Sequence, residues 1–362
     1  MNILFLSHLP GTSYAGPTYS VPKQIEAQSK LDNVFWYNAT KKTIHKWKEL
    51  PYYHDLSEYP EESIYSLPEP FNHPDVVVVE LFYNMTLSRF RRELVSGSVP
   101  YIIIPRGELT KQAQKRKHLK KCIANLFFCK RFAERAAAIQ YLTEQEYKDS
   151  GDQWNKKHII IPNGIDMPER VKTAFHRDEI RCVSIGRIEP YQKGLDLLIE
   201  ACSQIKDELF EAHCTFTICG PDQEGKVEGL KNLVTERGLD SIITFRDAVY
   251  GKEKEELLLE SDVFIMPSRF EGHPMALIEA LSYGLPCIVT TGSNMREEVE
   301  QNNAGWTSDT TEERIAAAIL NMLIERELLE KKKKNAYELA AKYSWSIIAT
   351  HCSVTLNKIV SC

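Results

Sequence analysis

Short runs of apolar residues alternate with amphipathic segments along the whole chain. In the first half these runs predict strands near residues 2–7, 34–37, 76–81, 101–104, 137–142 and 158–161, with helices between most of them. A second series starts at Ile180 and comprises IRCVSIG, TFTICG, IITF, DVFIMP and PCIVTT, again with helical segments between them. Such alternation is typical of parallel sheets covered by helices on both faces, so we expect an α/β protein.

The polar segment at residues 163–179, NGIDMPERVKTAFHRDE, contains a turn signal and separates the two series. A chain of 362 residues is long enough for two domains with separate cores, so we place the domain boundary in this segment. The last residues, from Tyr343 onward, are expected to form a closing helix. The cleft between two such domains is the default position of a ligand site.

Residues 44–74 carry five prolines and many aromatic residues without clear periodicity. We expect a long ordered loop there. Such a loop in a compact domain more often has a function than not. Partial disorder is the alternative.

The cysteines and the charge distribution indicate the redox compartment and the kind of partner to expect. The nine cysteines form no C-x-x-C pair and no Cys/His cluster at zinc spacing, so buried free thiols and a reducing compartment are expected. Residues 1–165 hold 22 Lys and Arg against 17 Asp and Glu, a net of +5, and the remainder holds 23 against 33, a net of −10. The first half is therefore the part suited to an anionic partner or surface.

The start of the chain and its apolar runs bear on localisation. Met1 leads directly into an expected strand, without the pattern of a secretory signal, so export is not expected. The longest apolar runs are far shorter than the roughly 20 residues that span a bilayer. We therefore expect a cytoplasmic protein that is soluble or peripheral to a membrane.

Glu271 and Glu279 lie eight residues apart in RFEGHPMALIEAL, which joins an expected buried strand to an expected helix. Backbone N–H groups around His273, Met275 and Ala276 would point outward at the start of this helix and could hold an oxyanion or phosphate. The two carboxylates could then bind hydroxyl groups. Two solvated glutamates without a ligand are the alternative.

Arg187 and Lys193 flank the loop RIEPYQKG between another expected strand and helix. In an open α/β sheet this loop lies over the carboxyl ends of the strands, as does the Glu271 loop, so both cations can converge on a diphosphate. Exposed cations near a helix start, with no ligand, are the alternative.

The loop SHLPGTSYAGPTYSV follows the first expected strand, and Gly16 would let its backbone approach a ligand closely. A glycine that serves only packing is the alternative. Neither a G-x-G-x-x-G fingerprint nor a Walker motif is present, so a dinucleotide or ATP site is not indicated. The chain also lacks a D-x-D pair, so we expect no metal and no cofactor; leaving-group charge would be neutralised by Arg187, Lys193 and helix-terminal N–H groups.

Residues 111–135 contain nine Lys or Arg and one acid, a net of +8. Apolar residues interleave with the cations, as in a basic amphipathic helix that lies on an anionic membrane or binds an anionic acceptor. These are Leu119, Ile123, Leu126, Phe127, Cys129 and Phe132. Nucleic-acid binding is less favoured because the rest of the chain is acidic, and a plainly solvated helix face is a further alternative.

Several motifs occur in one order: the Gly16 loop, PRGEL at 105–109, PNGID at 162–166, GRIEPYQKG at 186–194, the EGHPMALIE block and a closing YSW segment. This order resembles that of the family-4 retaining glycosyltransferases over nearly the whole chain, and the second half is the more specific part.

The resemblance implies a GT-B fold, in which two Rossmann-like domains face a cleft. It implies an acceptor-side domain at 1–166, a nucleotide-sugar-binding domain at 167–343 and a C-terminal helix at 344–362 that returns to the first domain.

Carried over by position, the family pattern makes Arg187 and Lys193 the diphosphate clamp of a sugar nucleotide. Glu279 matches the carboxylate that binds the ribose hydroxyls, and Glu271 matches the one that contacts hydroxyls of the transferred sugar. A phosphate oxygen would help to deprotonate the acceptor on the face where the bond breaks, so no side-chain nucleophile is expected.

The backbone would supply further donor contacts. The N–H groups that follow Gly272, at His273, Met275 and Ala276, would hold sugar and phosphate, and Gly16 would let the first-domain loop approach the diphosphate. Two features depart from the family pattern. Arg106 stands where many members have His, and we expect it near the reacting centre; Pro22 lies inside the expected first helix.

These observations lead us to expect a metal-independent, retaining glycosyltransferase that moves a sugar from a UDP- or GDP-sugar to a glycan acceptor. The acceptor is expected to be lipid-linked, in the assembly of a surface polysaccharide such as O-antigen, capsule or exopolysaccharide, with residues 111–135 in peripheral contact with the inner membrane. A GT-B sugar-nucleotide epimerase, which needs no acceptor region, is one alternative. A catalytically silent interaction subunit is the other.

Overall fold

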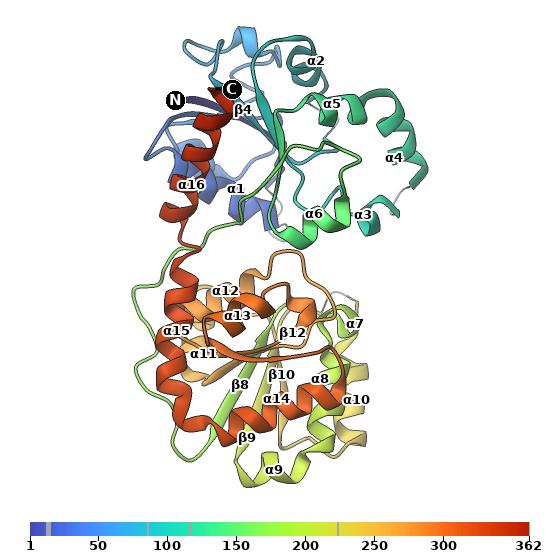
Figure 1. Cartoon of the computed structure of the whole chain (residues 1–362), viewed down its shortest axis with the longest axis vertical. Coiled ribbons are helices and arrows are strands. Elements are labelled where there is room, and N and C mark those ends of the chain that lie inside the picture. The colour runs from blue at the N-terminus through green and yellow to red at the C-terminus, as the bar shows by residue number, and fades with distance from the viewer. Residues whose placement is uncertain (12–15, 85–86, 116–117, 223, 362) are drawn as a thin grey trace. The chain divides into compact units, whose positions relative to one another are not determined.

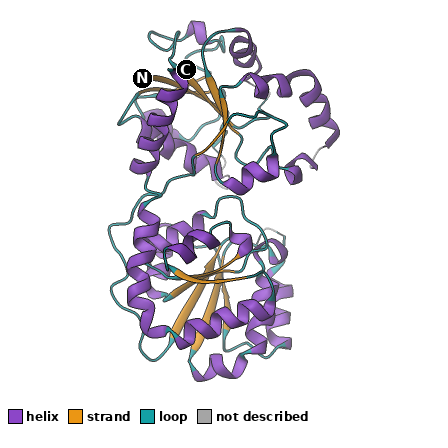
Figure 2. Cartoon of the chain, in the orientation of Figure 1, coloured by secondary structure: helices purple, strands orange, loops and turns teal. Residues whose placement is uncertain are grey.

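The structure is a computed structural model that describes residues 1–11, 16–84, 87–115, 118–222 and 224–361. The chain forms two compact units: one comprises Met1–Gly164 together with Trp345–Cys362, and the other comprises Ile165–Ser344. In each unit a central sheet is covered by helices (Figures 1 and 2). No described helix is long and apolar enough to span a bilayer.

The first unit is built on a seven-stranded parallel sheet in the order β3-β2-β1-β4-β5-β6-β7. The strands are β1 (Asn2–Ser7), β2 (Asn33–Asn38), β3 (Tyr53–Asp55), β4 (Val76–Glu80), β5 (Tyr101–Ile104), β6 (Ala138–Tyr141) and β7 (His158–Ile160). The helices are α1 (Gly16–Gln28), α2 (Ser88–Ser96), α3 (Lys111–Lys115), α4 (His118–Ala124), the π-helical turn η4 (Asn125–Cys129), α5 (Lys130–Arg135), α6 (Glu144–Ser150) and α16 (Trp345–Val360).

Both faces of this sheet are buried because successive side chains of a strand point to opposite faces. Along β1, Leu4 and Leu6 join one apolar cluster, whereas Ile3 and Phe5 join the other. The second cluster includes residues of α1 and of α16, which pack together (Figure 1). The C-terminal helix therefore returns to the first unit, as the GT-B resemblance implied.

The second unit contains a six-stranded parallel sheet in the order β10-β9-β8-β11-β12-β13. Its strands are β8 (Ile180–Ile185), β9 (Cys214–Cys219), β10 (Ile243–Arg246), β11 (Val263–Met266), β12 (Cys287–Thr290) and β13 (Gly305–Ser308). Its helices are α7 (Pro190–Lys193), α8 (Leu195–Gln204), α9 (Lys206–Glu211), α10 (Val227–Glu236), α11 (Gly251–Glu260), α12 (Met275–Ser282), α13 (Arg296–Gln301), α14 (Glu312–Ile324) and α15 (Leu329–Ala341). This is the doubly wound order of a Rossmann-like sheet, so the predicted α/β class is confirmed.

The segment at 44–74 is ordered, as expected, but it is not simply a loop. It contains the short helices η1 (His45–Glu49) and η2 (Ile64–Ser66) and the edge strand β3. Trp47 and Phe71 from this segment are buried in the two clusters of the first unit. Sequence periodicity missed β3 because a strand of three residues, one of them an aspartate, has too few positions to show an alternation.

The basic segment at 111–135 is helical over its described residues, as its pattern predicted, but it includes a π-helical turn. It comprises α3 and then α4, η4 and α5, which follow one another directly. Two of its cations, Arg116 and Lys117, lie outside the described residues, as do the side chains of Leu119 and Phe127.

The cysteines agree with the expectation of buried free thiols. Among the described residues, Cys122 is exposed and the others are buried, and none forms a disulfide.

Candidate functional site

The second unit has its topological switch point between β8 and β11, where the strand order reverses. The two strands are adjacent and parallel, with Val263 opposite Cys182 and Phe264 opposite Val183. In open α/β sheets, ligands bind in the crevice outside the carboxyl ends of the strands at this point. The segments that follow β8 and β11 carry Arg187, Lys193 and Glu271, so the fold brings these three predicted residues to one place.

Close backbone packing holds the β8 loop against the end of β11. Gly194 has a φ of +62°, in the left-handed region, and a Cβ built on it would lie 2.0 Å from the carbonyl oxygen of Pro267. Only glycine allows both this conformation and this approach. Gly220 supports the same loop from β9, since a Cβ there would lie 1.7 Å from the carbonyl oxygen of Gly186.

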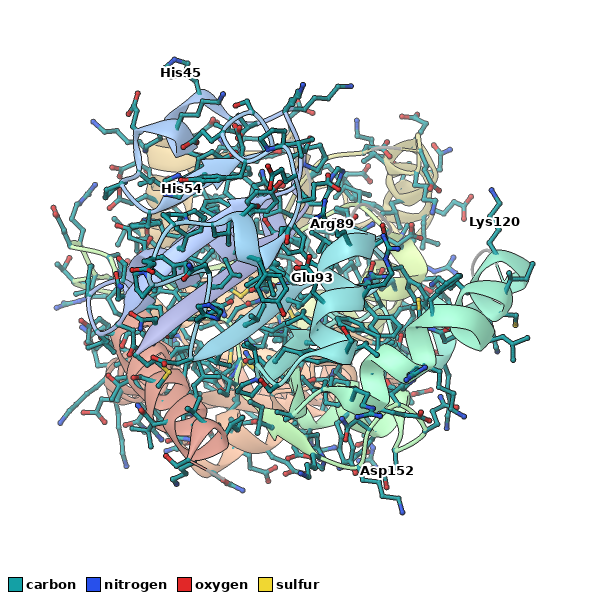
Figure 3. All side chains as sticks on the ribbon, turned by 90° about the horizontal axis from the view of Figure 1, so that it is seen from above. His45, His54, Arg89, Glu93, Lys120 and Asp152 are labelled. Carbon is teal, nitrogen blue, oxygen red and sulfur yellow. The ribbon has the colours of Figure 1, made fainter. Side chains whose placement is uncertain are left out.

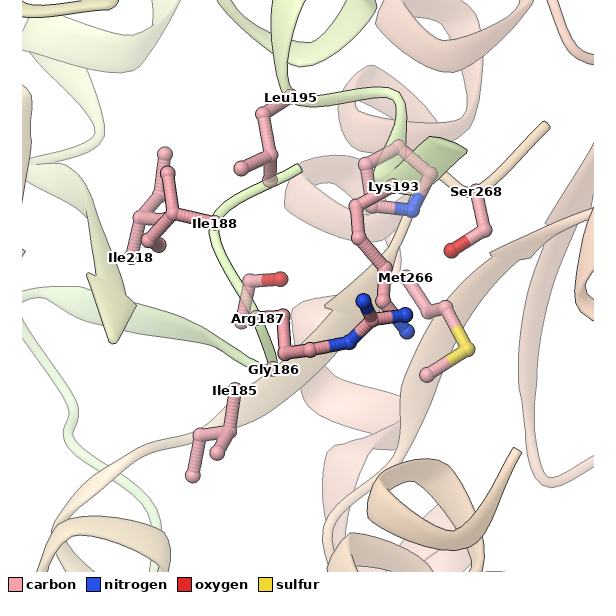
Figure 4. Close-up of a pocket in the computed structure, with 11 residues that line it drawn as sticks. Ile185, Gly186, Arg187, Ile188, Lys193, Leu195, Ile218, Met266 and Ser268 are labelled. Carbon is pink, nitrogen blue, oxygen red and sulfur yellow. The ribbon is translucent and has the colours of Figure 1, made fainter. Parts of the chain in front are cut away.

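A pocket lies between these segments, and both predicted cations line it (Figure 4). Gly186, Arg187 and Lys193 contribute from the β8 side, and Met266 and Ser268 from the β11 side. The side chains of Arg187 and Lys193 are both drawn at this pocket (Figure 4). The pocket therefore combines two cations with an apolar floor, which suits the diphosphate of a small organic ligand.

Lys193 and Glu271 contact each other directly. Lys193 Nζ lies 2.7 Å from Glu271 Oε1, and the Ser268 hydroxyl donates to the same oxygen at 2.6 Å. The Glu271 side chain is only 8% exposed. Sequence reasoning did not identify Ser268, although it stands three residues before Glu271. The carboxylate is thus held by a cation and a hydroxyl, while Arg187 has a weaker contact, 3.4 Å from Gln192 Oε1.

The start of α12 differs in one respect from the prediction. Pro274 adopts φ −82° and ψ 70°, the conformation of an inverse γ-turn, and the Met275 N–H donates to the His273 carbonyl at 2.9 Å. The expectation of a free N–H at Met275 is therefore wrong for this structure. Among the described residues, the N–H of Ala276, a predicted donor, has no backbone acceptor, and neither has the N–H of Gly272, so these two groups are available.

Asn294 braces the segment before α12 and was not singled out from the sequence. It adopts a left-handed conformation with φ +59°, and its side-chain amide donates to the carbonyl oxygens of Glu271 and Gly272. A single Asn in a loop carries no pattern by which this contact could have been predicted.

Glu279 lies inside α12, on the turn that follows its start, and it is about one-third exposed. Its carboxylate pairs with Lys254 of α11 at 2.6 Å. The two predicted carboxylates therefore have different surroundings, since Glu271 is buried among site residues and Glu279 is at the surface beside a lysine. Lys254 was not predicted.

Gly16, the predicted glycine of the first unit, is the first residue of α1. Among the described residues, no heavy atom lies within 4 Å of a Cβ built on Gly16. Packing within the described part of the unit therefore does not require glycine here, which weakens the packing alternative. Residues 12–15 of the same loop lie outside the description.

Arg106 is a buried node of the first unit. Its backbone has a φ of +48°, and its guanidinium donates to Glu80 at 2.8 Å, Asn163 at 2.7 Å, Gln24 at 2.7 Å and Ser20 at 3.1 Å. The side chain is 4% exposed. These contacts connect α1, the end of β4 and the segment after β7, so Arg106 organises the carboxyl edge of this sheet through other residues.

Two carboxylates secure the loop that contains Arg106. Glu146 accepts from the N–H groups of Gly107 and Leu142, and Glu108 accepts from those of Phe82 and Tyr83. Burial raises the pKa of Glu146 above its ordinary value of 4.5, while the two N–H donors and Arg106 oppose that rise.

The described residues contain no group of three or more His, Cys, Asp or Glu side chains that could hold a metal ion. Two side chains over the switch point, Arg187 and Lys193, are positively charged.

Comparisons with known proteins agree with this geometry. Residues 167–339 match the family model described as Glycosyl transferases group 1. The amylovoran biosynthesis glycosyltransferase AmsK of Erwinia amylovora is 31% identical over 167 residues, which are 44% of this chain and 39% of the relative. The putative colanic acid biosynthesis glycosyltransferase WcaL of Escherichia coli (strain K12) is 30% identical over 161 residues, 42% of this chain and 38% of the relative. The chain thus spans about two fifths of the length of these curated relatives.

Solved structures show the same fold over the whole chain. The sucrose-phosphate synthase of Thermosynechococcus elongatus superposes with a TM-score of 0.72 at 16% identity and covers 100% of both chains. Alr3699/HepE of Anabaena, in complex with UDP, superposes with a TM-score of 0.72 at 17% identity and covers 99% of this chain and 100% of its own. Identities this low establish the fold alone. Residues 167–339 are therefore a glycosyl transferases group 1 domain, within a chain that has the GT-B fold.

Proposed function

We propose that the protein is a retaining glycosyltransferase that moves a sugar from a UDP- or GDP-sugar to a glycan acceptor in the biosynthesis of a bacterial-type surface polysaccharide. The observation that carries this proposal is the arrangement over the β8/β11 switch point, where Arg187 and Lys193 line one pocket and Lys193 pairs with the buried carboxylate of Glu271. The names of AmsK and WcaL, which are biosynthetic glycosyltransferases, support the polysaccharide class.

Arg187 and Lys193 would bind the diphosphate of the donor, and the N–H groups of Gly272 and Ala276 would add neutral donors. The diphosphate would compete with Glu271 for Lys193, because one ammonium group now serves that carboxylate at 2.7 Å. Glu271 would then accept hydrogen bonds from hydroxyl groups of the transferred sugar, and Glu279 would accept them from the ribose hydroxyls. These cations neutralise the leaving diphosphate, so the proposed reaction requires no metal ion.

Transfer would occur on the face of the sugar from which the diphosphate leaves. The carbon–oxygen bond to the diphosphate breaks through an oxocarbenium-like transition state, and a diphosphate oxygen takes the proton of the acceptor hydroxyl as the new glycosidic bond forms. No protein nucleophile takes part. The protein's contribution is to position the donor and to stabilise the charge that develops on the diphosphate.

We further propose that the acceptor is lipid-linked and that the first unit contacts the cytoplasmic face of an anionic membrane through residues 111–135. Three large apolar side chains of this segment are exposed: Ile123 at 61%, Leu126 at 78% and Phe128 at 62%. Exposed cations accompany them, among them Lys120, which projects from the ribbon in Figure 3, and Lys130. Basic residues beside exposed apolar ones suit an anionic membrane surface.

A panel of UDP- and GDP-sugars tests the donor proposal by thermal shift. A ligand at a hundred times its dissociation constant adds about 2.7 kcal/mol to the free energy of unfolding, so the matching donor should raise the melting temperature clearly above the others. Stabilisation by none of them would contradict the proposal. A donor whose sugar is epimerised without an acceptor would identify an epimerase instead, and binding without any turnover would identify a silent homologue.

A further inference from the structure

Arg269 lies between β11 and α12 and has contacts that the proposed donor site does not yet explain. Its guanidinium makes two parallel hydrogen bonds to Asp196, at 2.7 and 2.8 Å. The same group donates to the Tyr191 carbonyl at 2.9 Å and lies 4.5 Å from the centroid of the Tyr191 ring. The Arg269 N–H donates to the Gln192 carbonyl at 2.9 Å.

All three partners of Arg269 belong to the segment that carries Lys193. Tyr191 and Gln192 precede Lys193 in α7, and Asp196 is in the first turn of α8. Arg269 itself stands two residues before Glu271. The Arg269 contacts therefore join the segment that would bind the diphosphate to the segment that would bind the transferred sugar.

These two segments follow different strands and lie far apart in the chain, so only noncovalent contacts can set the distance between them. Gly194 permits a close approach to Pro267, but packing against a single carbonyl does not fix how the helical turn is rotated. A bidentate Arg–carboxylate pair does constrain orientation, because the planar fork of the guanidinium matches the two carboxylate oxygens.

The Arg269–Asp196 pair is expected to contribute little to the stability of the fold. The Arg269 side chain is 20% exposed and Asp196 is 37% exposed, and ion pairs in such positions add about 0–1 kcal/mol to the free energy of unfolding. Positioning is a different matter, since a displacement of about 1 Å at a reacting centre can lower the rate by about a hundredfold.

We propose that Arg269 and Asp196 are positioning residues. They hold the Arg187–Lys193 segment at a fixed distance and orientation relative to Glu271, so that the diphosphate and the sugar of one donor can be bound together. This inference rests on the proposed function, because it assigns the pair a task in donor binding. Neither residue touches the donor in this assignment.

The test compares Arg269→Ala, Asp196→Ala, the double variant and Arg269→Lys with the wild type. UDP and GDP binding is measured by calorimetry, and kcat and KM are measured with the donor found in the sugar-nucleotide panel. We expect each alanine variant to bind the nucleotide about tenfold more weakly and to lower kcat by about a hundredfold. The double variant should lose no more than either single one, because both remove the same contact. Arg269→Lys keeps the charge without the planar fork and should fall between wild type and Arg269→Ala.

A second bidentate pair in the same unit provides the matched control. Arg237 donates to Glu200 at 2.7 and 2.8 Å, with the arginine more exposed than Arg269 (41% against 20%), but it joins the end of α10 to α8 rather than the two site segments. Arg237→Ala should leave nucleotide binding and kcat unchanged. The melting temperature of each variant without nucleotide should stay within about 2 °C of wild type, as expected for a pair worth less than 1 kcal/mol.

The outcomes separate the two proposals. If the wild type binds neither UDP nor GDP, the proposed function fails and takes this inference with it. If the wild type binds but Arg269→Ala behaves like Arg237→Ala, only the positioning role is overturned. Additive losses in the double variant, or losses matched by a lower melting temperature without nucleotide, would also overturn it.

Discussion

Glu271 and Glu279 differ in the residues that they contact and in how exposed they are. Glu271 is buried against Lys193 and Ser268, whereas Glu279 pairs with Lys254 at the surface. A buried carboxylate held in place by a cation and a hydroxyl is preorganised, and preorganised groups contribute most where charge or geometry changes during the reaction. The more exposed carboxylate is better suited to binding a part of the donor that does not react.

Alanine variants of the two glutamates should therefore fail in different ways. Glu279→Ala removes charge-assisted hydrogen bonds to the ribose and should weaken UDP or GDP binding about tenfold or more, with kcat little changed. Glu271→Ala should lower kcat by about a hundredfold and leave the nucleotide affinity within about threefold of wild type. Calorimetry with the nucleotide and steady-state kinetics with the donor measure the two effects.

Glu256 provides the control for this comparison, because it forms an exposed ion pair with Arg170 in the same unit. Glu256→Ala should match wild type in both measurements. Equal effects of Glu271→Ala and Glu279→Ala, or effects no larger than that of Glu256→Ala, would refute the division of roles.

Arg106 leads to a prediction about the first unit. Arg106→His, which introduces the residue that many family members have, would leave the fully buried Glu80 without its cation. Removing one partner of a buried ion pair costs about 3–5 kcal/mol, so urea unfolding should show a loss of that size. Arg89→His is the control, since Arg89 is 51% exposed and its partner Glu93 keeps hydrogen bonds from Ser63 and Ile64, so the loss should cost less than about 1 kcal/mol. A stable Arg106→His variant would contradict the buried node and favour direct contact with the substrate.

The sequence could predict which residue types stand over the switch point, but not how they pair. Arg187, Lys193 and Glu271 were identified because each occupies a loop after an apolar run, which is a local pattern. Lys254, Arg269 and Asn294 were missed, because each acts through contacts between segments that are far apart in the chain and that leave no periodic signal.

For whole strands and helices, too, the sequence predicted those with a clear local pattern and missed those that depend on distant contacts. Strands such as β1 and β4 were predicted because their apolar runs are long enough for burial on both faces. The four-residue β13 (GWTS) was not predicted, because it contains one large apolar residue and depends on pairing with β12. The helical pattern over 111–135 was recognised, but the π-helical turn η4 within it was not, since such a turn has no signature in the apolar spacing.

The turn between α7 and α8 allows a prediction for one element. Gly194→Ala would place a methyl group against the Pro267 carbonyl in a left-handed conformation, so the turn must move and carry Lys193 away from Glu271. We expect nucleotide binding to weaken at least about tenfold and the free energy of unfolding to fall by about 1–3 kcal/mol. Calorimetry and urea unfolding give the two quantities.

Gly229→Ala is the control for Gly194→Ala. Gly229 lies inside α10, its φ is not in the left-handed region and a Cβ there would contact nothing within 4 Å. Alanine at that position should stabilise the protein by up to about 1 kcal/mol and leave nucleotide binding unchanged. If Gly194→Ala bound nucleotide as well as Gly229→Ala does, the close approach would have no role in the site.

For the molecule as a whole, the alternation of strands and helices was sufficient to predict two parallel-sheet units. In each unit the loops at the carboxyl edge are where ligand-binding residues are expected, because parallel strands all end there. The donor side is therefore the better determined half of the proposed reaction. The acceptor side depends on residues that no local pattern identifies, apart from the charge and exposed apolar residues of 111–135.

Reversing charge in that segment should release the protein from anionic membranes. Lys115 and Lys120 are exposed, whereas Lys121 donates to the Ala113 carbonyl and lies over the Tyr83 ring, so Lys115→Glu with Lys120→Glu reverses charge and leaves the Lys121 contacts in place. Each lysine near such a surface contributes about 1 kcal/mol, so the double variant should bind vesicles of anionic phospholipid at least about thirtyfold more weakly.

Lys331→Glu with Lys334→Glu makes the same net charge change on α15 of the other unit and should bind like wild type. Equal weakening in both double variants would indicate a response to total charge, and no weakening in either would contradict a role of these lysines in membrane binding.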